Sequence, residues 1–278
     1  MFEIPTATRP PQTTTSADGT TIAYDLHGDA STGAPVVVCV GGATNTRLEW
    51  SSFCDALADR GLVGVTYDRR GRGDSSDTAP YAVAREVEDL TAVVEAVRAG
   101  GRAVALGFSS GAALVLRAAA AGAPLERAVI MEPPYRIEGS PPLPDAYCDT
   151  LEAMIAEGRN DDAFEYFQVR AVGLPQEMVD GMKGTEMWAY FARTAPTLSY
   201  DGHCLGGNVQ AFPTELVAGI EAPILALAST GSPPFLQGPA RMVGETAPNA
   251  RFELLEGEFH TVPDDVLADA VAGFAREG

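Results

Sequence analysis

The chain has little positive charge and no long apolar run. Of its 278 residues 19 are Lys or Arg, against 38 Asp or Glu, and Lys183 is the only lysine. The formal net charge of -19 disfavours binding to nucleic acid or to an anionic membrane. No apolar run approaches the roughly 18 residues that a membrane-spanning helix needs, and the first residues lack the regions of a secretory signal. We therefore expect a cytoplasmic protein with neither partner.

Cysteine and histidine are also scarce. The chain has 4 cysteines and 3 histidines, with no C-x-x-C spacing and no histidine at a metal-ligand interval from a cysteine. We therefore predict no metal site. Hydrophobic residues make up 46% of the chain, which is enough for a large buried core.

Short apolar runs alternate with helical patterns at both ends of the chain. An Asp-Gly turn within 13–28 predicts a hairpin, and β-branched runs without polar alternation predict buried strands. This alternation favours a mostly parallel sheet with helices on both faces. The expected strands are 35–40, 62–68, 102–108, 125–133, 222–229 and 251–257, and the expected helices are 46–61, 81–101, 109–122, 239–248 and 264–277.

The alternation stops between about Pro133 and Pro213, where no strand-like run occurs. Short segments in this region carry apolar residues at helical spacing and are separated by glycine and proline. We predict an α/β core formed by 1–132 and 214–278, interrupted by a helical cap, or lid, at 133–213. The expected cap helices are 143–158, 160–173, 175–184 and 185–194.

A serine between two glycines marks the candidate nucleophile. In the run VALGFSSGAAL the pattern G-x-S-x-G consists of Gly107, Ser109 and Gly111, directly between a predicted strand and a predicted helix. A sharp strand-to-helix turn needs neighbours without Cβ so that the helix packs closely and the central hydroxyl stands clear. We therefore predict that Ser109 is a nucleophile, while Ser110 is better placed to lend its backbone N–H.

At this point the sequence resembles the α/β-hydrolase fold family. Residues 67–76, YDRRGRGDSS, resemble the family's D-x-R-G-x-G-x-S loop, and GGAT at 41–44 stands where many members carry His-Gly. The resemblance implies a doubly wound, mostly parallel sheet with a helical cap inserted after the sixth strand. It also implies an oxyanion hole formed by the amides of Ser110 and of Ala43 or Gly42.

A serine hydroxyl needs a base that removes its proton. Of the three histidines, His27 precedes the parallel sheet and His203 lies in the helical region. His260 follows the last predicted strand, which is where the resemblance places the catalytic base, so we predict that His260 activates Ser109.

The acid that would orient this histidine is less evident. In most members an Asp follows the strand after the cap, but 222–229 leads into a segment without a carboxylate until Glu245. Glu132 ends the strand next to that of Ser109 and precedes two prolines, a position that some α/β-hydrolases use. We predict Glu132 as the acid. Asp201 or a Ser-His dyad remain the alternatives.

These residues predict a serine hydrolase that cleaves an ester- or lactone-like bond of a small, hydrophobic substrate without a cofactor. Carbon–carbon bond hydrolysis, cofactor-free lyase or cyclase chemistry, and a non-catalytic ligand receptor on the same scaffold are the alternatives. The oligomeric state is left open. Aromatic and sulfur-containing side chains of the helical region are candidate substrate contacts: Phe164, Phe167, Met187 and Trp188.

Overall fold

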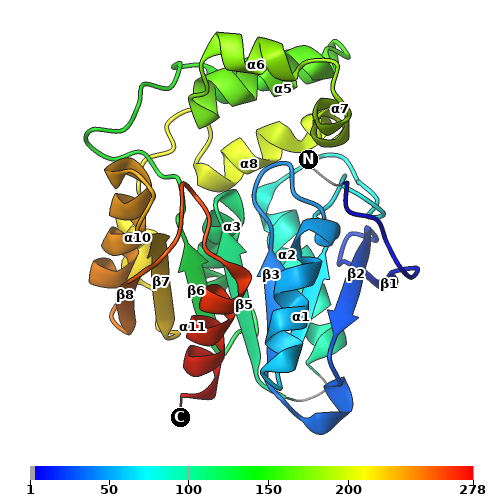
Figure 1. The fold of residues 1–278 in the computed structure, drawn as a ribbon, viewed down its shortest axis with the longest axis vertical. Helices are drawn as coiled ribbons and strands as arrows, with labels where there is room; N and C mark the ends of the chain where they lie inside the picture. Colours follow the sequence, from blue (N-terminus) through cyan, green and yellow to red (C-terminus); the bar gives the residue numbers. More distant parts are fainter. Residues whose placement is uncertain (1–3, 99–100, 278) are drawn as a thin grey trace.

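A computed structural model describes residues 4–98 and 101–277 and contains one eight-stranded sheet in the order β1-β2-β4-β3-β5-β6-β7-β8 (Figure 1). β1 and β2 form an antiparallel edge, and the other strands run parallel. The predicted fold class is confirmed. The strands are β1 (Gln12–Thr15), β2 (Thr21–His27), β3 (Val36–Val40), β4 (Val63–Tyr67), β5 (Ala103–Phe108), β6 (Arg127–Met131), β7 (Ile224–Ser229) and β8 (Ala250–Leu255).

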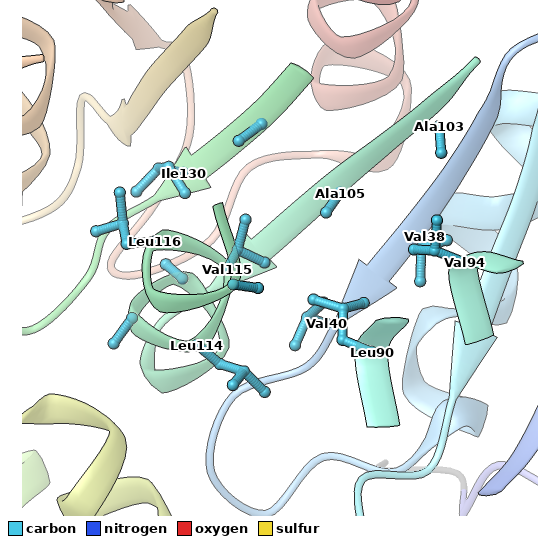
Figure 2. Close-up of a cluster of buried hydrophobic side chains, with 14 of the residues drawn as sticks. Val38, Val40, Leu90, Val94, Ala103, Ala105, Leu114, Val115, Leu116 and Ile130 are labelled. Atoms are coloured by element: carbon cyan, nitrogen blue, oxygen red, sulfur yellow. The ribbon is translucent and has the colours of Figure 1, made fainter. Parts of the chain in front are cut away.

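Helices cover both faces of the sheet, which explains why its central strands are apolar without alternation. In β3, Val38 and Val40 point into a core with α2, α3 and α10, which Figure 2 shows in part. Val37 and Cys39 point into a second core with α1 and α11, because successive side chains of a strand face opposite ways. These helices are α1 (Ser51–Asp59), α2 (Val83–Val97), α3 (Ser110–Ala120), α10 (Pro234–Thr246) and α11 (Asp264–Arg276).

The chain between β6 and β7 forms a separate helical layer with its own apolar core. Figure 1 shows α5, α6 and α7 farthest from the sheet, with α8 between them and the strands. The division into a core in two parts and a cap at 133–213 stays a prediction. The helices of this layer are α4 (Tyr147–Ala156), α5 (Asn160–Phe167) with a π-helical turn at Gln168–Val172, α6 (Gln176–Met182), α7 (Glu186–Ala192) and α8 (Leu198–Leu205). α9 (Thr214–Ala218) follows the layer and packs in the core of the sheet through Val217.

Two α-helices lie where none is expected, and a third begins earlier than expected. α8 and α9 were not anticipated, and α10 begins at Pro234 instead of 239. Proline is tolerated in the first turn of a helix, where its missing N–H needs no partner, so Pro234 starts α10. α8 contains Gly202 and Asp201, which have low helix propensity, and its formation depends on tertiary burial. Among the described residues, no helix has the length and apolar character needed to cross a membrane.

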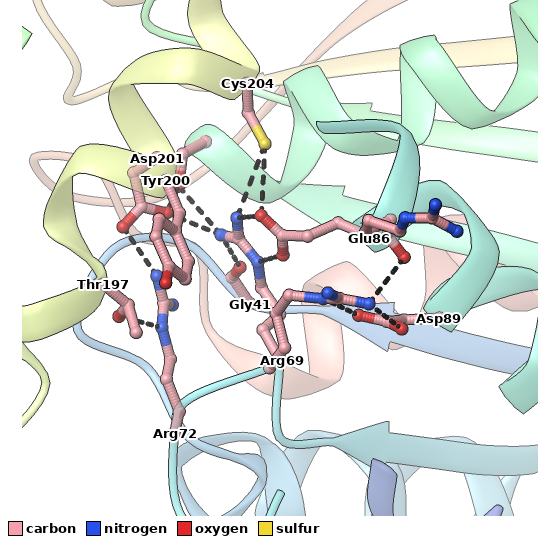
Figure 3. Close-up of polar contacts among 12 residues, drawn as sticks. Gly41, Arg69, Arg72, Glu86, Asp89, Thr197, Tyr200, Asp201 and Cys204 are labelled. Carbon is pink, nitrogen blue, oxygen red and sulfur yellow. Dashed lines mark hydrogen bonds and ion pairs between the residues drawn. The ribbon is translucent and has the colours of Figure 1, made fainter. Parts of the chain in front are cut away.

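A buried ionic cluster connects the helical layer to the sheet (Figure 3). Arg69, which follows β4, donates to both carboxylate oxygens of Glu86 on α2, at 2.7 and 2.8 Å. The same guanidinium donates to Asp201 on α8 at 2.6 Å. All three side chains are almost completely buried. Because a buried charge without a partner is very costly, Arg69 fixes α8 against the core.

Arg72 forms the second connection between the layers. Its guanidinium donates to Asp201 at 2.6 Å, to the Thr197 hydroxyl at 2.9 Å and to the Gly42 carbonyl at 2.7 Å. Asp201 therefore receives hydrogen bonds from two arginines of the loop after β4. The helical layer is held over the carboxyl ends of β3 and β4 by charge as well as by apolar contact.

Acid should destabilise the fold through Glu86. Burial alone would raise the pKa of this carboxyl, but the charge of Arg69 and its hydrogen bonds outweigh the lost hydration and lower the pKa from 4.5 to about 2. Such a group contributes stability above pH 4.5, and the contribution disappears as pH falls toward 2. Loss of this contribution in acid should lower the free energy of unfolding by about 3 kcal/mol.

Chemical denaturation of the wild type and Glu86→Gln between pH 5 and pH 2 measures this contribution. The variant cannot ionise at this position, so it should be less stable at neutral pH and should lose part of the pH dependence. Glu88→Gln is the control, since Glu88 lies on the same helix with its side chain 36% exposed. If the free energy of unfolding fell equally steeply with pH in the wild type and in Glu86→Gln, this assignment would be contradicted.

Candidate active site

Ser109 lies on a strained turn between β5 and α3. Its backbone has φ 55° and ψ -124°, which a residue with a side chain rarely adopts. A Cβ on Gly107 would lie 2.5 Å from Ala112 Cα, and a Cβ on Gly111 would lie 2.1 Å from the Val40 carbonyl oxygen. Only glycine fits at these two positions. The motif therefore has the strand, sharp turn and helix geometry that the sequence predicts.

His260 and Glu132 are in direct contact. His260 Nδ1 lies 2.5 Å from Glu132 Oε2, and the Glu132 side chain is completely buried. The other carboxylate oxygen accepts a hydrogen bond from the Ser229 amide at 2.7 Å. The Ser232 hydroxyl accepts one from the His260 amide at 2.9 Å. The carboxylate thus holds one ring nitrogen and leaves Nε2 available for a reacting group.

Ser109 and His260 line the same cavity, which has a volume of about 350 Å³. The ring centroids of His260 and Phe108 lie 4.5 Å apart, and Phe108 directly precedes Ser109. The segments that follow β3, β5, β6, β7 and β8, including the first turn of α10, form the floor, and the helical layer forms the roof. Apolar side chains dominate the wall: Phe108, Leu143, Phe167, Val172, Phe191, Leu198, Leu205, Phe235, Leu236 and Phe259.

The other histidines have surface partners. His27 Nδ1 lies 2.6 Å from Asp55 Oδ1, and His203 Nε2 lies 2.6 Å from Glu152 Oε1. Neither histidine belongs to the part of the cavity wall that the structure describes. Over the described ranges, no group of three or more His, Cys, Asp or Glu side chains is arranged to hold a metal ion.

Asp201, the alternative acid, reaches the cavity wall but is bound by other groups. Its Oδ1 accepts hydrogen bonds from Arg69 and from the Ser110 hydroxyl at 2.6 and 2.7 Å. Its Oδ2 accepts one from Arg72. Of the two candidate carboxylates, Glu132 is the one in contact with His260. Asp201 acts instead as the anchor of the helical layer.

The candidate oxyanion donors do not have equal access. The Gly42 amide donates to Asn45 Oδ1 at 3.0 Å, so it is already engaged. Ala43 and Ser110 line the cavity next to Ser109. A Cβ on Gly42 would lie 2.8 Å from Ser109 Cβ, so Gly42 allows the two loops to approach closely. The Ala43 and Ser110 amides are the remaining candidates for holding a developing negative charge.

The four predicted substrate contacts separate into two groups. Phe167 lines the cavity. Phe164 and Trp188 pack against each other with centroids 4.6 Å apart inside the core of the helical layer, and Trp188 Nε1 donates to Asp161. Met187 is outside the described cavity wall. Helical spacing identified Phe164 and Trp188 as buried, but it could not separate the layer's own core from the face toward the sheet.

Several wall residues had no part in the sequence prediction, among them Phe108, Arg136, Arg170 and Phe235. Phe108 is the last residue of β5, Arg136 lies in the loop after β6, and Phe235 lies in the first turn of α10, which follows β7. Ligands of open α/β sheets bind beyond those strand ends. This rule identifies the loops that contribute, although it does not identify the residues that face inward.

Comparisons with known proteins agree with the fold. A model of the alpha/beta hydrolase family matches residues 37–270. The chain is 42% identical to an alpha/beta hydrolase from Sphaerobacter thermophilus DSM 20745 of known structure, with a TM-score of 0.83 over 95% of this chain and 99% of that one. The esterase RhEst1 from Rhodococcus sp. ECU1013 shares the fold, with 22% identity and a TM-score of 0.65 over 96% and 98% of the chains.

A curated relative is similar over a shorter stretch. It is "Putative carbamate hydrolase RutD" from Caulobacter segnis, 35% identical over 88 residues, which are 31% of this chain and 32% of that protein. The match thus spans about a third of the relative's length. The family model covers most of the chain, from β3 to α11. The chain therefore belongs to the alpha/beta hydrolase family.

Proposed function

We propose that this protein is a serine hydrolase that cleaves an ester- or lactone-like bond of a small molecule through an acyl-enzyme on Ser109. The observation that carries the proposal is the contact between His260 Nδ1 and the buried Glu132 carboxylate, at the edge of a cavity that Ser109 also lines. An imidazole held in this way presents Nε2 as a base. Family membership and the fold shared with an esterase support the same reaction class.

The proposed reaction has two halves. His260 Nε2 takes the Ser109 proton while the serine oxygen attacks the substrate carbonyl, and the Ala43 and Ser110 amides stabilise the oxyanion. The tetrahedral intermediate collapses, and the leaving alcohol receives the proton from His260. Water then attacks the acyl-enzyme with His260 again as base, which releases the acid and restores Ser109. Glu132 stabilises the imidazolium in both halves.

The cavity supports a small substrate with an apolar part. Its volume of about 350 Å³ lies at the lower end of the range for small-molecule sites. Aromatic side chains from both layers, such as Phe108 and Phe191, form much of its wall. A missing carboxylate after β7 would favour a non-catalytic receptor, but the contact between Glu132 and His260 supports an acid that acts from another strand end.

A fluorophosphonate should label Ser109. The probe reacts with a serine only where a base activates the hydroxyl, so the wild type should gain one covalent adduct per chain by intact mass spectrometry. Ser109→Ala should gain none. Ser52→Ala, which removes an exposed serine of α1, is the control and should still be labelled. An unlabelled wild type in the native state would favour the receptor.

Glu132→Gln should lower kcat/KM for an aryl ester by about 10³- to 10⁴-fold. A neutral amide fills the same space but cannot stabilise the imidazolium, and it can hold the ring in the wrong tautomer. Steady-state hydrolysis measures the loss, and circular dichroism checks that the variant is folded. Glu258→Gln, an exposed carboxylate in the same loop as His260, is the control. Wild-type rates in Glu132→Gln would show that the acid has another source.

A further inference from the structure

The cavity wall has an excess of positive charge although the whole chain is strongly negative. Its charged lining residues, besides the histidine, are Arg136, Arg170 and Asp201. Asp201 is neutralised by Arg69 and Arg72. Within the described residues, neither Arg136 nor Arg170 has a carboxylate at salt-bridge distance, as the pairs found there involve other cations. The wall residues whose charge is not balanced by a carboxylate are therefore the two arginines.

Arg136 is held in position from three sides. Its backbone amide donates to the Gln210 carbonyl at 2.8 Å, and its backbone bridges to Ala211. Its guanidinium donates to the Pro141 carbonyl. Gln210 itself is a buried residue with φ 50°, in the left-handed region that non-glycine residues rarely adopt. Arg136 thus has its charge fixed in the wall before a ligand arrives, which lowers the entropic cost of binding.

The charge of Arg136 is poorly compensated where it lies. Desolvation lowers the pKa of Arg136. For Arg69 the same effect is outweighed by Glu86 and Asp201, so that its pKa is raised. A partly buried cation without an acidic partner costs free energy, and an anion that enters the cavity would remove that cost. The planar guanidinium is also well suited to bind a carboxylate through two parallel hydrogen bonds.

Arg170 adds a second cation from the opposite layer. It lies in the π-helical turn at Gln168–Val172, whose residues Gln168, Ala171 and Val172 also line the cavity. Arg170 is exposed, so its guanidinium is hydrated and contributes less than that of Arg136. One arginine thus comes from the loop after β6 and the other from the roof.

We propose that the cavity binds substrates that carry a carboxylate remote from the bond to be cleaved, with Arg136 as the principal binding group and Arg170 as a weaker second one. This inference rests on the proposed function, because it concerns the substrate of the Ser109 site. The carboxylate takes the end of the cavity near Arg136, and the apolar wall holds the rest of the molecule.

The test compares esters that differ in one charged group. Monoethyl adipate and ethyl heptanoate differ in the acyl part, and 4-acetoxybenzoate and 4-methylphenyl acetate differ in the alcohol part. For each pair, the ratio of kcat/KM for the charged ester to that for the neutral one is measured by proton release. We expect the wild type to favour the charged ester in at least one pair. No preference in either pair would overturn the proposal.

Variants of the two arginines assign the preference to residues. Arg136→Gln should reduce the ratio by about 10- to 100-fold, as expected for loss of a hydrogen bond between charged groups. Arg136→Lys keeps the charge and should retain part of the ratio. It replaces Arg136→Gln as the test if Arg136→Gln does not fold. Arg170→Gln should reduce it less.

Arg241→Gln is the control. Arg241 is exposed, stacks on Phe252 and lies outside the described cavity wall, so its loss should leave the ratio unchanged. A ratio that persists in Arg136→Gln would overturn the role of Arg136.

A binding measurement separates this inference from the proposed function. Ser109→Ala cannot form the acyl-enzyme, so calorimetric titration with monoethyl adipate measures binding alone. We expect binding that weakens by about 10-fold or more when Arg136→Gln is added. If no ester is hydrolysed but this binding is found, the hydrolase proposal fails and the carboxylate site stands. If esters are hydrolysed but monoethyl adipate and 4-acetoxybenzoate do not bind, the hydrolase proposal stands and the carboxylate site fails.

Discussion

The contact of Asp201 with Arg69 and Arg72 is the interaction on which the rest of the molecule depends. It places one carboxylate of α8 between two guanidinium groups of the loop after β4, all of them buried. A buried pair of single charges gains little, because desolvation offsets the attraction, but removing one partner from such a group is strongly destabilising. The cluster therefore determines where the helical layer sits. The cavity exists because that layer lies over the ends of the strands.

The candidate catalytic residues share a second constraint, which is an unfavourable backbone at the strand ends. Ser109, Glu132 and His260 have φ values of 55°, 45° and 52°. Hydrogen bonds from the sheet hold the first two, since the Ser109 amide donates to Met131 and the Glu132 amide to Leu227. Non-glycine residues stay in this region only where the surrounding structure imposes it, and such strain is concentrated at functional sites.

Most of the fold could be predicted from the sequence because its strongest signals are local. The apolar runs of the strands and the glycines around Ser109 express requirements of the backbone itself. Glu132 was also accessible, since it follows a strand that neighbours that of Ser109. The features that could not be predicted depend on tertiary contacts. α8 is stabilised by burial and by Arg69, and Phe164 packs inward within its own layer. Neither feature has a signature in sequence spacing.

The charge of the cavity shows why net charge is a poor guide to a ligand. A total of -19 suggests that anions are repelled, but it is spread over the whole surface and screened beyond about 8 Å in physiological salt. A ligand inside the cavity interacts mainly with the groups in its wall, because salt screens nearby and partly buried charges less than distant ones on the surface. There Asp201 is neutralised, whereas Arg136 is not. The local balance, and not the total, decides which charge the cavity accepts.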